Sequence, residues 1–197
     1  VVVGDVRNLT GDVRLDDALE QAFRISLEQS PYVNLLSDLK VRDTLQRMQR
    51  KPDAPVDRTL GSEIALRDGV RALILPTVAE VGGRLRVSAE VVDPRTQTTV
   101  YAVSADGRGL ESVLGSIDEV SDQLRNKLGE AMESVQKNSV PLPNVSTTNL
   151  DALKAYAVAR NLHLSGRSSE ALEALSSALA LDQRFASAHA AQGYVHA

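Results

Sequence analysis

The sequence predicts an α+β fold, a mixed sheet with helices on one face, followed by an all-α helical-repeat segment. Three observations predict it. Two runs rich in β-branched residues flank the pair Gly82-Gly83, stretches with helical periodicity lie on both sides of these runs, and the composition turns to Ala, Leu and Ser from about Asn149. Strands that alternate apolar and polar residues need a layer of helices on one side only, which the flanking stretches supply.

The Gly82-Gly83 pair predicts a two-residue hairpin, because such turns need positive φ and glycine adopts it without steric cost. With this loop Val81 faces Arg84, and the register of the two strands follows. One face is then apolar and the other mostly polar. The apolar face comprises Ile74, Val78, Leu85, Val87, Ala89 and Val91, and the other face Thr77, Ala79, Arg84, Arg86, Ser88 and Glu90.

The remaining elements follow from apolar spacing and from capping residues. Pro76 lies inside a predicted strand and has no N–H to donate, so we expect an edge or a bulge there. In chain order we expect a strand over 1–7, a helix capped by Asp16 or Asp17 and reaching about Gln29, a strand over 32–36, a helix capped by Ser37 or Asp38, a helix over 62–68, three strands within 71–105 and a helix over 110–135.

The domain boundary is expected where periodicity stops. We predict an α/β domain over 1–135, a linker over 136–148 and a repeat segment over 149–197, with helices over 149–164 and 168–181 and a third beginning at Phe185. Val1 falls inside a predicted strand and Ala197 inside a predicted helix, so we expect the chain to be part of a longer protein.

The composition excludes several functions. A formal charge of −4 argues against a nucleic-acid interface, which needs a basic face. The absence of cysteine excludes disulfides, thiolate catalysis and cysteine metal sites. No apolar run approaches the roughly 18 residues that cross a bilayer, so a membrane contact is expected only through segments outside this chain. We find no catalytic motif and expect no enzymatic activity and no cofactor.

The order of small and large residues near the end of the chain resembles a tetratricopeptide repeat (TPR). Adding the repeat period of about 34 residues to Ala159 gives Gly193, which also fits. Gln183 and Ala155 depart from the pattern, and the segment covers one full repeat and the start of a second. The resemblance rests on Ala155, Val158, Ala159, Leu162, Gly166, Ala171, Leu175 and Ala178.

The first domain is similar to the TolB-like N-terminal α/β domain. The similarity rests on the opening strand, the turn over 8–12, the Gly82-Gly83 hairpin and the turn over 91–94. Together the two resemblances imply the sensory region of a membrane-anchored bacterial signalling protein whose other part is a kinase, a nucleotide cyclase or a winged-helix regulator. Among these, the sequence looks closest to a cyclase of a peptide-modification system.

The repeat resemblance also implies a set of partner-binding residues. Tyr156, Arg160 and His163 share one helical face, and Tyr194 is the equivalent of Arg160 one repeat later. In this family such positions line a groove, where arginine can hold a carboxylate and tyrosine supplies rigid contact area. The alternative that they are ordinary exposed residues stays open.

Other candidate sites are weaker. His163, His189 and His196 share no i, i+4 spacing, so surface histidines are favoured over a metal site. The acidic residues around Asp12 suit helix capping better than a calcium loop. The turn over 8–12 is the candidate cleft for a nucleotide or another small molecule.

The leading hypothesis is a non-catalytic sensory or protein-interaction region that binds a peptide or protein. The alternatives are a small-molecule or nucleotide-binding domain of a regulator, or an envelope assembly factor. We expect a periplasmic location, as the extracytoplasmic part of an inner-membrane protein, with a cytoplasmic location as the alternative. Self-association stays open.

Overall fold

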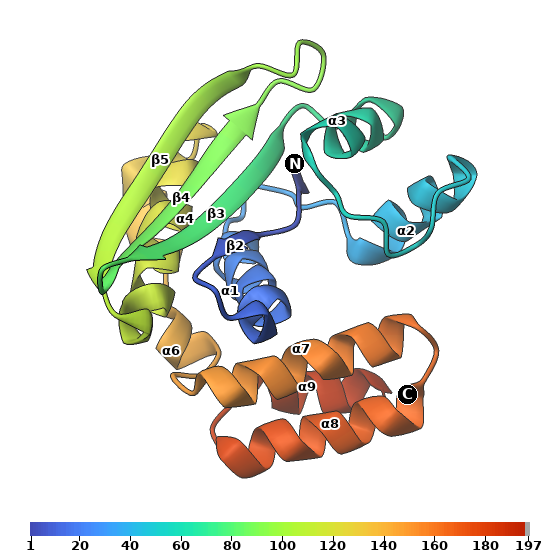
Figure 1. The fold of residues 1–197 in the computed structure, drawn as a ribbon, viewed down its shortest axis with the longest axis vertical. Helices are drawn as coiled ribbons and strands as arrows, with labels where there is room; N and C mark the ends of the chain where they lie inside the picture. Colours follow the sequence, from blue (N-terminus) through green and yellow to red (C-terminus); the bar gives the residue numbers. More distant parts are fainter. Residues whose placement is uncertain (196–197) are drawn as a thin grey trace.

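A mixed five-stranded sheet forms one layer of the molecule (Figure 1). The computed structural model describes residues 1–195, so His196 and Ala197 lie outside the described part. The strands are β1 (Val2–Val3), β2 (Arg7–Leu9), β3 (Leu73–Val81), β4 (Arg84–Val92) and β5 (Thr99–Arg108). The helices are the 3-10 turns η1 (Val13–Leu15) and η2 (Leu110–Ser112) and the α-helices α1 (Asp16–Glu28), α2 (Asp38–Arg47), α3 (Arg58–Arg67), α4 (Val113–Lys127), α5 (Met132–Asn138), α6 (Leu142–Val145), α7 (Leu150–Leu164), α8 (Ser168–Leu181) and α9 (Ala186–Val195).

The predicted hairpin is confirmed. β3 and β4 pair antiparallel with Val81 opposite Arg84, and Gly82 and Gly83 have φ of 60° and 74°. All six residues of the predicted apolar face are at most 4% exposed. The local turn chemistry and the alternation of residue types therefore determine the register of this hairpin.

Pro76 lies in an interior strand, so the expectation of an edge or a bulge at this position is wrong. β3 pairs on one side with β4 and on the other with β1 and then β2, which are parallel to it. The pairing with β1 ends at Ile74 and the pairing with β2 begins at Thr77, so Pro76 falls at the break between them. A proline is tolerated there because no neighbouring carbonyl needs its missing N–H.

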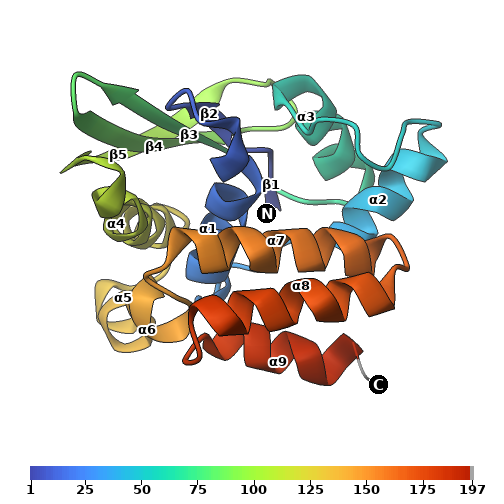
Figure 2. The same cartoon turned by 60° about the horizontal axis from the view of Figure 1, so that its bottom comes forward.

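Helices cover both faces of the sheet, which corrects the prediction of helices on one face. α1 and α4 pack on the apolar face of the sheet, which we call the inner face, and α7 packs on the far side of α1 (Figure 2). On the other face α2 and α3 cover one end of the sheet and enclose a second core. That core contains Val2, Leu45, Val56, Ile64, Ala65, Leu73 and Val92.

The C-terminal helices form where the sequence predicts them, but they are not a separate all-α repeat segment. Leu153 and Tyr156 of α7, and Phe185 before α9, belong to the same hydrophobic core as Leu19 and Phe23 of α1. Small residues let α7 and α8 pack closely, and this pattern is shared by any tight pair of antiparallel helices. The division of the chain into domains at 136–148 stays a prediction.

Other expected features are wrong. The strand expected over 1–7 is divided into β1 and β2, and Asp16 and Asp17 lie in the first turn of α1 without capping it. No strand forms over 32–36, because Leu36 donates its N–H to the Val1 carbonyl and no ladder of hydrogen bonds extends from that contact. The helix expected over 110–135 ends at Lys127, and Gly129 turns the chain with φ 105° before α5 begins. Part of the predicted linker is therefore helical.

A buried ion pair explains that turn. Arg125 and Glu130 are each 1% exposed, and the guanidinium of Arg125 donates to both carboxylate oxygens of Glu130 at 2.9 Å. Ser30 and Ser134 donate to the same carboxylate at 2.5 and 2.8 Å. The hydrogen bonds from Arg125, followed by those from the serines, lower the pKa of Glu130 to about 2.

Glu130→Ala should lower the free energy of unfolding by about 3 kcal/mol, because it leaves the Arg125 charge buried without a partner. The exposed Glu133→Ala should change it by less than about 0.5 kcal/mol. Glu130 has a lowered pKa, so its contribution is present above its unfolded pKa of 4.5 and is lost as pH falls towards 2. Urea unfolding at pH 7 and pH 3 measures this, and equal losses at both pH values would contradict the assignment.

Candidate functional site

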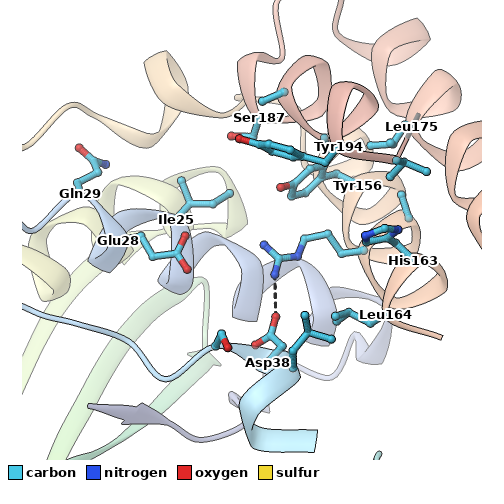
Figure 3. A pocket seen from close by; sticks show the side chains of 17 residues that line it. Ile25, Glu28, Gln29, Asp38, Tyr156, His163, Leu164, Leu175, Ser187 and Tyr194 are labelled. Carbon is cyan, nitrogen blue, oxygen red and sulfur yellow. Dashed lines mark hydrogen bonds and ion pairs between the residues drawn. The ribbon is translucent and has the colours of Figure 1, made fainter. Parts of the chain in front are cut away.

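The main cavity lies where α1 and α2 face the C-terminal helices. It has a volume of about 580 Å³, and side chains from α1, α2, α7, α8 and α9 line it. Its walls include the apolar side chains of Ile25 and Leu175 and the polar side chains of Glu28 and His163 (Figure 3). The cavity exists because α7 packs on α1 while α9 packs on α8, so a gap remains between α1 and α9.

Asp38 joins three elements beside this cavity. Arg160 of α7 contacts one carboxylate oxygen at 2.7 Å, drawn dashed in Figure 3, and Arg24 of α1 contacts the other at 2.5 Å. Asp38 is the first residue of α2, and Ser37 caps this helix through the Lys40 N–H, as predicted. The carboxylate therefore lies near the positive end of the helix dipole as well.

Tyr156 lines the cavity and packs against Phe185 behind it. Tyr156 is 6% exposed, and its ring lies 5.1 Å from the ring of Phe185 with the planes tilted by 48°. This is a favourable distance for two aromatic rings. Burial raises the pKa of Tyr156. Tyr194, by contrast, is 76% exposed at the mouth.

All four residues predicted from the sequence line this one cavity: Tyr156, Arg160, His163 and Tyr194. Arg160 is not free to hold a carboxylate of a partner, because it already binds Asp38. Their role in partner binding stays a prediction. Helical spacing did not predict the contacts with Asp38 and Arg24, because it indicates neighbours within one helix and not contacts between different helices.

A second cavity of about 380 Å³ lies on the other side of Asp38 and is lined mainly by polar groups. Glu20 of α1 is partly buried in its wall, together with Asp5 and Asp17. Burial of the Glu20 carboxyl, and then the nearby Asp5, raise its pKa to about 7. Within residues 1–195, no three His, Asp or Glu side chains converge as a metal site requires.

The turn over 8–12 does not form an open cleft. The Asn8 side chain donates to the Asp12 carbonyl at 2.8 Å and to the Asp16 carboxylate at 2.7 Å. The Asp12 carboxylate binds Arg14 and caps η1. These groups are already paired within the chain and line neither cavity. The small-molecule hypothesis for this turn therefore lacks support.

Solved structures with a similar fold are known. The C-terminal domain of LpoB from Escherichia coli matches with a TM-score of 0.50 and 15% identity, over 54% of this chain and 79% of that domain. Lipoprotein GNA1162 from Neisseria meningitidis matches with a TM-score of 0.44 and 22% identity, over 64% and 96% of the two chains. The PelC dodecamer from Paraburkholderia phytofirmans matches with a TM-score of 0.44 and 14% identity, over 66% and 86%.

At this identity the likeness to the LpoB domain concerns the fold alone, and the two lower scores add no argument. No family model matches the sequence. No curated protein matches it either.

The comparisons correct the expected family. The interpretation as a TolB-like domain followed by TPR repeats of a signalling protein is wrong, because the fold is similar to that of the C-terminal domain of LpoB. The C-terminal helices also share the core of the first layer instead of forming a separate segment. The motifs that suggested both families describe local turns and a close helix pair, which many folds contain.

Asp38→Asn should destabilise the fold by about 3 kcal/mol, because it removes the charge partner of Arg24, which is only 4% exposed. Arg160→Gln should lower the free energy of unfolding by about 1 kcal/mol or less. The Arg160 side chain is 28% exposed, so water can solvate the Asp38 oxygen that the substitution leaves without its partner. Thermal and urea unfolding compare the two. Equal effects would show that Arg24 does not depend on Asp38.

Glu20→Gln should stabilise the protein at pH 8 by about 1–3 kcal/mol and have little effect at pH 4. The folded pKa of Glu20 is raised, so its favourable contribution is complete below pH 4.5 and is lost as pH rises through about 7. Glu133→Gln, which removes the same charge from an exposed position, is the control. A pH-independent effect of Glu20→Gln would contradict the assigned pKa.

Proposed function

We propose that this chain is a non-catalytic assembly factor of the bacterial envelope that acts outside the cytoplasm by binding another protein. The observation that carries the proposal is the fold shared with the C-terminal domain of LpoB at a TM-score of 0.50. A fold alone does not determine function, so the proposal also rests on the cavity beside Asp38. None of the helices described over residues 1–195 is long and apolar enough to cross a bilayer.

The cavity beside Asp38 supports protein binding. Its mouth presents the ring of Tyr194 and the imidazole of His163 above apolar side chains, a combination that suits a polypeptide segment with an apolar anchor. Arg160 and Tyr156 are held by contacts within the chain and shape the wall. We therefore assign the contacts with a partner to Tyr194 and His163 and the support of these contacts to Arg160 and Tyr156.

Two exposed tyrosines allow a matched test. Tyr194 lies at the cavity mouth and is 76% exposed, while Tyr32 is 64% exposed and lines neither cavity. Tyr194→Ala should weaken partner binding about ten-fold or more, the effect of losing an aromatic anchor. Neither variant should change the melting temperature by more than a few degrees, because exposed side chains contribute little to stability.

The measurement is complementation in the source bacterium. Deletion of the gene should make the envelope sensitive to detergent, the wild-type chain and Tyr32→Ala should restore resistance, and Tyr194→Ala should not. Fractionation should find the protein outside the cytoplasm. A deletion strain with a normal envelope, or a protein confined to the cytoplasm, would refute the proposed function, and a fully active Tyr194→Ala would refute the assigned site.

A further inference from the structure

The outer face of the sheet is open at the hairpin end. α2 and α3 cover only the end that contains Leu73 and Val92, and Figure 2 shows no helix over the outer side of β3, β4 and β5 towards the hairpin. The side chains on this part of the face are half-buried or exposed, whereas most of those on the inner face are buried. This end of the face is therefore available to another surface.

The open part of the face is strongly basic. Arg84 on β4 stands directly opposite Arg108 on β5, and Arg86 stands opposite Asp106. Arg7 of β2 lies on the same face, since it pairs with Thr77 of β3, which faces Ser88. The open part of the face therefore carries four arginines and one aspartate, in a chain whose formal charge is −4. Glu90 lies on the same face nearer its covered end and is paired with Arg58.

Most of this positive charge has no partner in the described part of the chain. Arg86 is neutralised, because it donates to both oxygens of Asp106 at 2.7 and 2.8 Å. Arg7, Arg84 and Arg108 make no side-chain hydrogen bond or ion pair with residues 1–195. Like charges directly opposite one another on a sheet are destabilising, so the Arg84 and Arg108 pair costs stability unless an anion lies between the two side chains.

Apolar side chains lie beside these arginines. Val81, the last residue of β3, pairs with Arg84 and is 79% exposed. Leu9 of β2 lies on the same face, opposite Ala79, and is 49% exposed. The hairpin end thus combines exposed valine and leucine with unpaired arginines, the two features that favour binding at the surface of an anionic bilayer.

We propose that the hairpin end of the outer sheet face docks on a bilayer of anionic phospholipid, with headgroup phosphates between Arg84 and Arg108 and with Val81 inserted at the headgroup level. The planar guanidinium groups match the oxygens of a phosphate. Charge complementarity favours this partner, because the face is basic while the rest of the chain is acidic and turns away from an anionic surface. The assignment of this bilayer-docking face does not depend on the proposed function.

The test is co-sedimentation of the intact chain with vesicles. Vesicles of phosphatidylcholine and phosphatidylglycerol in equal parts should bind it at about 0.01 M salt, and binding should fall at about 0.15 M as the Debye length shortens. Arg84→Gln/Arg108→Gln should weaken binding about 25-fold, since each arginine near the surface contributes about five-fold. Val81→Ser should weaken binding less, and by the same factor at both salt concentrations.

Arg50→Gln/Arg95→Gln is the matched control, because it removes two exposed arginines that lie off this face. It should bind vesicles as the wild type does. The proposal is overturned if the wild type does not bind anionic vesicles at low salt, if vesicles of phosphatidylcholine alone bind equally well, or if both double variants lose binding to the same extent. Circular dichroism melting confirms that the variants are folded, and failure here leaves the complementation test of the cavity unaffected.

Discussion

The carboxylate of Asp38 joins the consecutive helices α1 and α2 to α7, which is distant in the sequence. Arg24 is almost fully buried in α1, and a buried guanidinium needs an anionic partner. Asp38 supplies it from the first residue of α2 and at the same time binds Arg160 of α7. Because α1 lies between the sheet and α7, this contact fixes the distance between the sheet layer and the C-terminal helices. Both cavities border on Asp38 and owe their shape to it.

The molecule offers two surfaces with different chemistry on its two sides. The C-terminal helices present a cavity with apolar lining residues and a tyrosine at its mouth, while the bilayer-docking face is basic. The inner core lies between them, and Figure 2 shows the sheet and α9 on opposite sides of the helical layer. A protein partner and a membrane would therefore not compete for the same residues.

What the sequence predicted correctly depends on neighbours within a few residues. The glycine pair and the alternation around it determine the hairpin, and helical spacing brings Tyr156, Arg160 and His163 to one cavity. What it missed depends on distant contacts. The break after Lys127 allows the buried pair of Arg125 and Glu130 to form, and Asp38, the partner of Arg160, lies 122 residues away in the sequence. The order of small and large residues indicated a close helix pair correctly, and its extension to a repeat family was wrong because the pattern is not specific to repeats.

The shared core has a consequence for how the chain reaches its native state. Phe23 and Leu19 pack with residues of α7 that are synthesised more than a hundred positions later, so one side of α1 stays uncovered while the rest of the sheet layer is complete. Contacts of such long sequence separation slow folding and leave apolar surface open in the meantime. A nascent or translocating copy of this chain would thus present a helix surface that holding chaperones recognise, until Leu153 and Tyr156 emerge and close it.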